Sequence, residues 1–307
     1  MKILMLGVGG VGGYFGARLV QAGADVTFLV RPARQARLAR DGLRIESPYG
    51  NFQVSPRCVT AETLKPGYDV IVLAPKAFDL DSAIDTVAPA VGAETVVLPF
   101  LNGWSHLALL DARFGPSRVL GGVAHIAGEL GADGVVRQLS HIHSLTVGGR
   151  DDATRAVAER FIAACSAAHF DSTLSQDITR VLWEKWVFLA TLAGATTLMG
   201  APVGAIVATP HGDALIRRLY GECVAIAEAD GRAVSRDASG KALGLLTEPG
   251  SAFTASMLRD LQAGLPTEHE HVLGALVRIG EARACDLPLL TAALVHMQVR
   301  AAGCGVP

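Results

Sequence analysis

A short glycine-rich stretch sets the fold of this chain: Leu4-Met5-Leu6-Gly7-Val8-Gly9-Gly10-Val11-Gly12. A G-x-G-x-x-G pattern that directly follows an apolar strand and opens a helix predicts a dinucleotide-binding turn. In such a turn Gly7 permits the tight bend, Gly9 lets the backbone approach a pyrophosphate, and Gly12 allows close packing of helix on strand. The free N–H groups at the start of the helix would then bind the phosphates. The alternative is a structural turn that binds no ligand.

Apolar runs without polar alternation recur along the first half of the chain, as expected for parallel strands covered on both faces. The runs are Ile3–Leu6, Val26–Val30, Val70–Leu73 and Val96–Leu98. Helical segments such as Gly13–Gln21 and Ala33–Arg40 lie between them, and further strands are expected within Val119–Val147, with a turn at Ala132–Gly134. Alternating strands and helices predict an α/β fold, with an N-terminal Rossmann domain built on a doubly wound parallel sheet.

After Gly148 the pattern changes to alanine-rich segments with helical spacing. These segments are Ala153–His169, Gln176–Leu198, Asp213–Gly231, Ser256–Ala263 and Glu268–Ala284. They predict a C-terminal all-α domain, with the boundary between Gly148 and Gln176. We place the dinucleotide-binding Rossmann domain at residues 1–170 and the helical domain at residues 171–307.

The composition fits two globular domains and argues against several classes of protein. Of the 307 residues, 50% are hydrophobic and 18% are charged, which is enough apolar surface for substantial cores. A formal net charge of −2 provides no general attraction to nucleic acid or to an anionic membrane. No apolar run is long enough to cross a bilayer. We therefore expect no nucleic-acid or membrane partner and a cytoplasmic location.

The cysteines and histidines lack the spacing of a metal site. The cysteines form no C-x-x-C pair, which argues against a disulfide scaffold or a zinc ribbon. They are Cys58, Cys165, Cys223, Cys285 and Cys304, and we expect them in the core. His141 and His143 would share one face of a strand, and a second cluster spans Glu268–His271. Neither cluster has the H-E-x-x-H spacing or a third clear ligand, so no metal is expected.

The identity of the dinucleotide depends on the residue that follows the second strand. NAD-specific turns place a carboxylate there to bind the ribose 2′-hydroxyl. Here Arg31 occupies that place, and no carboxylate follows before Asp41. A guanidinium can form charge-assisted hydrogen bonds with a 2′-phosphate, so the sequence predicts NADP(H) bound by Arg31. Whether Arg34 joins it stays open, and Arg37 and Arg40 are expected on a solvated helix face.

Several short motifs accompany the glycine turn at spacings that resemble one known family. They are Ala74-Pro75-Lys76, Leu101-Asn102-Gly103, Trp183-Glu184-Lys185, Ser256-Met257-Leu258-Arg259-Asp260 and Thr267-Glu268. Nearly the whole chain is similar to the ketopantoate reductases (2-dehydropantoate 2-reductases). The resemblance implies a two-domain enzyme of pantothenate biosynthesis that transfers hydride from NADPH to a 2-oxo acid or related ketone. It also implies an active site in the cleft between the domains and a homodimer formed through the helical domain.

The resemblance implies a role for each matching residue. Lys185 would be the general acid and, with Asn102 and Ser256, would bind substrate, while Asn102 would also take part in catalysis and contact the cofactor. Further cofactor contacts would come from Lys76, Ala127 and Glu268. Hydride addition to a ketone leaves an alkoxide, which an ammonium group can stabilise and protonate. Burial lowers the pKa of a lysine, and Lys185 lies in the apolar run Val181–Leu189.

The sequence departs from the family where polar substrate contacts are expected. Leu189, Ala193, Val203 and Leu273 stand where the family usually has asparagines. Because sites built for polar substituents discriminate strongly, the reaction type carries over better than the substrate. Reduction of a bulkier or more apolar 2-oxo acid or ketone outside pantothenate synthesis therefore stays open. So do another hydroxyacid dehydrogenase of similar domain order and a noncatalytic NADP(H)-binding sensor.

Overall fold

The computed structural model describes residues 1–303 and divides the chain into two compact units. The first unit comprises Met1–Leu101 and His106–Thr179, and the second comprises Asn102–Ser105 together with the chain from Arg180 onward. Cys304, which we expect in the core, lies outside the described residues. The assignment of one unit to the cofactor and the other to substrate and dimerisation stays a prediction.

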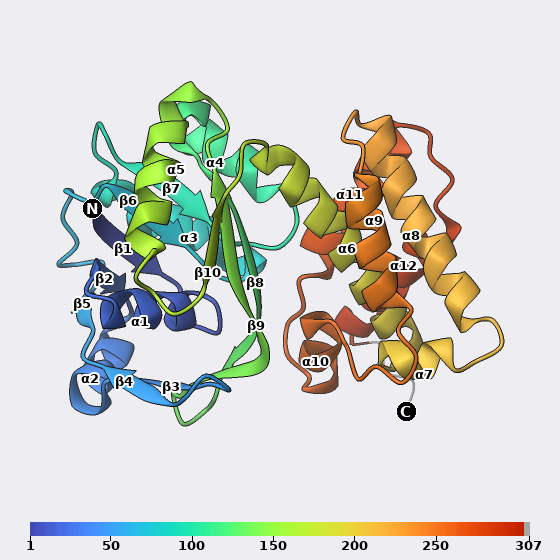
Figure 1. The fold of residues 1–307 in the computed structure, drawn as a ribbon, viewed down its shortest axis with the longest axis horizontal. Coiled ribbons are helices and arrows are strands. Elements are labelled where there is room, and N and C mark those ends of the chain that lie inside the picture. Colours follow the sequence, from blue (N-terminus) through green and yellow to red (C-terminus); the bar gives the residue numbers. More distant parts are fainter. Residues whose placement is uncertain (304–307) are drawn as a thin grey trace. The chain divides into compact units, whose positions relative to one another are not determined.

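The first unit is built on a five-stranded parallel sheet with the strand order β5-β2-β1-β6-β7 (Figure 1). Its strands are β1 (Lys2–Leu6), β2 (Asp25–Leu29), β5 (Arg57–Val59), β6 (Val70–Leu73) and β7 (Val96–Pro99). β1 pairs with β2 on one side and with β6 on the other, so the chain changes direction across the sheet at β1. This arrangement confirms the predicted doubly wound Rossmann fold.

Helices lie between the strands of the first unit. They are α1 (Gly12–Gln21), α2 (Pro32–Asp41), α3 (Leu80–Val87), α4 (His106–Phe114) and α5 (Asp152–Cys165), with 3₁₀ turns η1 (Ala77–Asp79), η2 (Ala88–Ala90) and η3 (Pro116–Arg118). The sequence predicts an amphipathic α1, whereas every residue from Gly12 to Leu19 is buried. The reason is a second sheet that covers the side of α1 opposite the first sheet.

The second sheet has the order β10-β9-β3-β4, with β8 also paired to β9. Its strands are β3 (Leu43–Glu46), β4 (Phe52–Val54), β8 (Gly121–Leu130), β9 (Val136–Gly148) and β10 (Asp171–Leu174). α1 contacts β3, β4 and β9 of this sheet as well as β1 and β2 of the first. β8 and β9 form a hairpin whose tip contains the predicted turn, where Gly134 has φ +74°.

The first unit extends beyond the expected division at residue 170. β10 pairs in parallel with β9, from Asp171 opposite Ser144 to Leu174 opposite Val147. α5 lies against β9 and β10 (Figure 1), and its side chains share a core with the sheet strands. The segment up to Thr179 therefore belongs to the first unit.

The second unit is helical, as predicted. Its elements are α6 (Ile178–Met199), α7 (Val203–Val207), α8 (Gly212–Ala229), α9 (Arg236–Leu246), α10 (Ser256–Gln262), the π-helical turn Glu270–Gly274, α11 (Ala275–Ala282) and α12 (Pro288–Ala301). α6, α8 and α10 lie within two residues of their predicted bounds, whereas α9 and α12 were not predicted. Within residues 1–303, no helix combines the length and the apolar character needed to cross a membrane.

A buried carboxylate on α8 holds the start of α12. Glu222 is 7% exposed and accepts hydrogen bonds from the backbone N–H groups of Leu289, at 3.1 Å, and Leu290, at 2.9 Å. The residue preceding α12, Leu287, cannot cap the helix with its side chain. Glu222 therefore satisfies N–H groups that an α-helix leaves unpaired at its N-terminus.

We predict that Glu222→Ala lowers the free energy of unfolding by about 1–3 kcal/mol, because two buried N–H groups lose their acceptor. Denaturant titration monitored by circular dichroism measures this change. Glu228→Ala, at an exposed position of the same helix, is the matched control and should change stability little. Equal effects of the two substitutions would contradict the capping role.

Candidate active site

The glycine turn is held by contacts between backbone atoms. A Cβ atom on Gly7, which has φ +98°, would collide with the Ala74 carbonyl group, and one on Gly10 would collide with the Gly128 carbonyl group. A Cβ on Gly12 would collide with the carbonyl oxygen of Gly7. Around Gly9, by contrast, a Cβ would meet no atom within 4 Å. Gly7, Gly10 and Gly12 thus allow close packing, whereas Gly9 borders open space that a ligand can enter.

That open space is part of a cavity of about 560 Å³ at the carboxyl ends of β1 and β2. Gly7, Val8 and Gly9 line it together with Arg31 and Arg34. Gly10, Val11, Gly12, Lys76 and Ala127 are not among its lining residues. In doubly wound sheets, ligands bind at this point, where the strand order reverses. The structure therefore brings the first half of the glycine motif and the diagnostic arginine to one cavity.

The two arginines of the cavity differ in their surroundings. Arg31 is exposed and directly precedes α2. Arg34 is half-buried and donates from Nη2 to the carbonyl oxygen of Gly134 at 3.3 Å. Its Nε is enclosed and has no hydrogen-bond partner within residues 1–303. Burial and the neighbouring Arg37 guanidinium lower the pKa of Arg34.

The hairpin tip also binds an arginine that we expect to be solvated. Arg37 donates from Nη1 to the carbonyl oxygen of Ala132 at 3.2 Å, so it packs against the turn and not only against water. Arg40 is exposed, as expected, and pairs with the adjacent Asp41. Acidic side chains reach the cavity from other elements, since Glu62 and Asp79 also line it.

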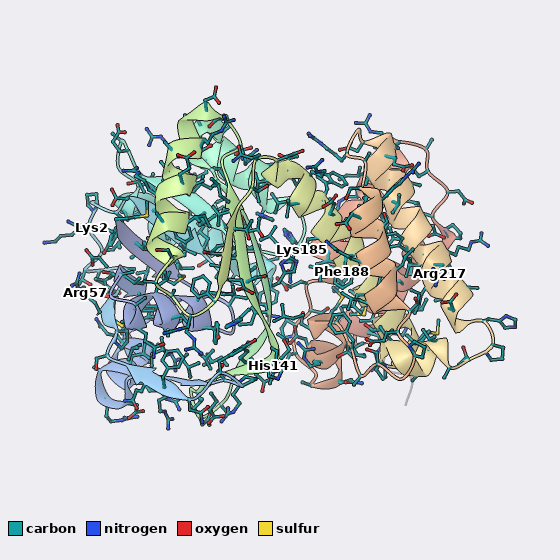
Figure 2. All side chains as sticks on the ribbon, viewed as in Figure 1. Lys2, Arg57, His141, Lys185, Phe188 and Arg217 are labelled. Carbon is teal, nitrogen blue, oxygen red and sulfur yellow. The ribbon has the colours of Figure 1, made fainter. Side chains whose placement is uncertain are left out.

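Lys185 lies on α6 in the second unit, where Figure 2 labels it together with Phe188. Its neighbours Trp183 and Trp186 are each 1% exposed and form part of the core. Burial lowers the pKa of Lys185 to about 8, while the Glu268 carboxylate acts in the opposite direction. The Lys185 ammonium group is therefore more acidic than that of a solvated lysine, and the Glu268 carboxylate lies near it.

The second unit also contains the remaining predicted residues Asn102, Ser256 and Glu268. Asn102 and Glu268 are half-buried, and Ser256 is the exposed first residue of α10. The Asn102 backbone and the Glu268 carboxylate both act on the pKa of His271, so these residues lie near one another. Glu184, within the predicted motif, has a structural contact: its carboxylate accepts from the backbone N–H of Ser235 at 3.1 Å.

The positions that depart from the family pattern are mostly in the core. Ala193, Val203 and Leu273 are 3%, 0% and 0% exposed and belong to the apolar core of the second unit. Leu189 alone is half-buried. The aromatic rings of Phe188 and Phe253 stack nearby in the fold, with centroids 6.1 Å apart. The departures therefore replace polar groups by packed apolar side chains.

The candidates for metal binding have other contacts. The rings of His141 and His143 both contact the Tyr49 ring, with centroids 5.6 and 4.1 Å away. His141 is exposed, whereas His143 is only 9% exposed. His143 Nδ1 lies 2.7 Å from the Tyr14 hydroxyl, and its ring stacks on Tyr49. Within residues 1–303, no group of three His, Cys, Asp or Glu side chains could hold a metal ion.

The cysteines of the described chain are free thiols. Cys165 and Cys223 are buried, as predicted, and burial raises the pKa of each to about 12. Cys58 and Cys285 are only partly buried. A raised pKa disfavours the reactive thiolate, so Cys165 and Cys223 act as packing residues.

Two family models match almost the whole chain. "Ketopantoate reductase PanE/ApbA" matches residues 3–152, and "Ketopantoate reductase PanE/ApbA C terminal" matches residues 177–301. The glycine-turn cavity and the half-buried Lys185 of the helical unit thus occur in the two parts that these models describe. The chain belongs to the ketopantoate reductase family of oxidoreductases.

Known proteins support this membership over their full length. The chain is 34% identical to the uncharacterized oxidoreductase YkpB of Bacillus subtilis, covering 97% of this chain and 98% of that protein. It is 30% identical to a 2-dehydropantoate 2-reductase of Mesorhizobium japonicum, covering 98% and 97%. The crystal structure of a 2-dehydropantoate 2-reductase from Geobacter metallireducens is similar with a TM-score of 0.87 and 26% identity, covering 97% and 99%.

Proposed function

We propose that this protein uses NADPH to reduce a 2-oxo acid or a related ketone to the hydroxy product. The observation that carries the proposal is the half-buried Lys185, whose pKa is lowered to about 8 next to the Glu268 carboxylate. A proton donor tuned in this way suits reduction of a carbonyl group, and a protein that only senses NADP(H) has no use for it. Membership of an oxidoreductase family supports the same reaction class.

The cavity of the first unit fits a nicotinamide dinucleotide. Gly9 leaves room for the pyrophosphate, and α1, which starts at Gly12, places a helix N-terminus directly after this turn, where phosphates are favoured. When bound, the nicotinamide supplies the hydride. In the proposed site Gly7, Val8, Gly9, Gly10, Val11 and Gly12 form the phosphate-binding turn. Lys76, Ala127, Asn102 and Glu268 would make further cofactor contacts, as the family resemblance implies.

The residues of the second unit manage the charge that develops on the substrate oxygen. The Lys185 ammonium stabilises the forming alkoxide and donates its proton to that oxygen. Glu268 favours the protonated form of Lys185 before the reaction. We assign Asn102 to orienting the reacting carbonyl group and Ser256 to binding the substrate. These assignments follow from the family resemblance.

We propose NADPH over NADH because of the charge at the end of β2. Arg31 and Arg34 line the cavity there, and α2 carries no carboxylate before Asp41. The Gly134 carbonyl accepts from Arg34 Nη2 and orients its guanidinium. A 2′-phosphate would give this group an acceptor. We therefore include Arg34 with Arg31 in the phosphate site.

The substrate class is a 2-oxo acid or ketone. The named 2-dehydropantoate 2-reductase relative supports ketopantoate, whereas the half-buried, apolar Leu189 favours a bulkier or more apolar substrate outside pantothenate synthesis. Ala193, Val203 and Leu273 pack in the core and leave no polar group there for a substrate. A homodimer, a cytoplasmic location and a role in pantothenate biosynthesis stay predictions from the family resemblance. They do not alter the chemistry assigned to Lys185.

We predict that Lys185→Ala lowers kcat/KM for the 2-oxo acid by about 10²–10⁴, the usual contribution of a general acid, with NADPH affinity retained. In the unsubstituted protein the reduction rate should fall as the pH rises through about 8, because the ammonium loses its proton there. Glu268 raises the pKa of Lys185, so Glu268→Gln should move this fall to lower pH. Steady-state kinetics across pH measures both effects.

Lys241→Ala is the matched control, since Lys241 is an exposed lysine of the same unit, paired with Asp237. It should leave the rate and its pH dependence unchanged. If Lys185→Ala reduced substrate at the normal rate, Lys185 would not be the proton donor.

We predict that Arg31→Ala and Arg34→Ala each weaken NADPH binding by about 10- to 100-fold, the effect of one lost charged hydrogen bond. NADH affinity should change little, because NADH lacks the 2′-phosphate. Fluorescence titration of the reduced nicotinamide measures both affinities. Arg40→Ala, on the exposed face of the same helix, serves as the control. An equal loss for both cofactors would mean that the arginine does not bind the 2′-phosphate.

A further inference from the structure

The backbone of Gly103 is enclosed by His271. Gly103, next to Asn102, has φ +83°, a left-handed conformation that favours glycine. A Cβ atom built there would lie 3.0 Å from both Cδ2 and the carbonyl oxygen of His271. The imidazole and the main chain of His271 therefore both pack against this glycine, and they restrict the conformations open to the segment Asn102–Ser105.

The same imidazole is hydrogen-bonded at the other end of the segment. Ser105 Oγ lies 3.2 Å from His271 Nδ1. Burial and Arg278 lower the pKa of His271, while Glu268 and the Asn102 backbone act in the opposite direction. The net effect is a pKa below the ordinary value, so the ring is neutral at neutral pH. In the tautomer that is unprotonated at Nδ1, a neutral ring can accept a hydrogen bond from the Ser105 hydroxyl group.

The backbone that carries His271 is itself fixed. In the π-helical turn, the N–H groups of His271 and Val272 both donate to the carbonyl oxygen of Glu268, at 3.1 and 2.9 Å. The Val272 carbonyl accepts from Trp186 Nε1 at 2.9 Å. Trp186 directly follows Lys185 on α6. The backbone of His271 is thus hydrogen-bonded to Glu268, three residues earlier. Its neighbour Val272 is hydrogen-bonded to α6, the helix that carries the proposed proton donor.

A second contact, made by Trp104, also holds the segment Asn102–Ser105 against α6. The Trp104 ring packs on Trp183 of α6, with centroids 5.6 Å apart, and the Arg232 guanidinium lies 5.9 Å from the centre of the Trp104 ring. Trp104 fixes the middle of the segment, whereas His271 contacts the residues on both sides of it. Short π-helical turns occur frequently at functional sites.

We propose that His271 is a positioning residue, whose imidazole holds the segment Asn102–Ser105 so that Asn102 keeps its place relative to Lys185 and Glu268. The role rests on the proposed function, because it acts through Asn102 in the reduction. Catalytic groups displaced by about 1 Å can cost about 10²-fold in rate. His271 therefore affects turnover without touching the substrate.

We predict that His271→Ala lowers kcat by about 10- to 100-fold, as expected for a displaced catalytic group, while the NADPH dissociation constant stays within about twofold. His271→Asn keeps a polar atom near the position of Nδ1 and should restore most of the lost kcat. When Asn102 is already alanine, His271→Ala should have no further effect, because residues that act as one unit are not additive. His269→Ala, which removes a neighbouring histidine bonded to Thr267, is the control.

A readout without catalysis separates this inference from the proposed function. Hydrogen exchange followed by mass spectrometry should show peptides covering residues 102–105 exchanging about 10-fold faster in His271→Ala and Ser105→Ala. Unchanged exchange, or additive losses of kcat with Asn102→Ala, would overturn the positioning role even in an active enzyme. A protein that reduces no 2-oxo acid would instead refute the proposed function, while faster exchange would still show that His271 fixes the segment.

Discussion

Contact between backbone atoms at the glycine turn is the constraint on which the cofactor site depends. Gly7 meets the end of β6 at Ala74, and Gly10 meets the β8–β9 hairpin at Gly128, with no room for a side chain at either place. These contacts fix the turn between two sheets and leave Gly9 open. The hairpin tip, in turn, orients Arg34 through the Gly134 carbonyl. The proposed phosphate binding and the proposed preference for NADPH thus depend on one set of close backbone contacts.

The chemistry of the second unit depends on a balance between burial and charge. Burial removes water from Lys185 and lowers its pKa, and Glu268 limits that decrease. The balance leaves an ammonium group that is protonated near neutral pH and still able to release its proton. Since α6 also contributes Trp183 and Trp186 to the core, the helix that carries the lysine is rigidly held. The packing of α6 therefore determines both the position of Lys185 and the acidity of its ammonium group.

Much of the fold could be predicted from local sequence, because the glycine motif and the apolar runs carry strong periodic signals. The burial of α1 from Gly12 to Leu19 could not, since it results from a second sheet formed by residues distant in sequence. The burial of Ala193, Val203 and Leu273 likewise depends on tertiary packing. The contacts on which the proposed role of His271 rests could not be predicted either, because Glu268–His271 gives only a metal-like pattern in the sequence. Its contacts with Gly103 and Ser105 join segments more than 160 residues apart.

The most direct test of the central claim is NADPH oxidation by the purified protein, followed by the loss of reduced-nicotinamide absorbance. The panel should contain ketopantoate and more apolar 2-oxo acids. We predict oxidation with at least one 2-oxo acid and none without substrate. Activity on ketopantoate would show that the core substitutions leave that substrate accepted, whereas activity only on apolar acids would place the enzyme outside pantothenate synthesis. Binding of NADPH without turnover of any panel member would contradict the account and indicate a noncatalytic NADP(H)-binding protein.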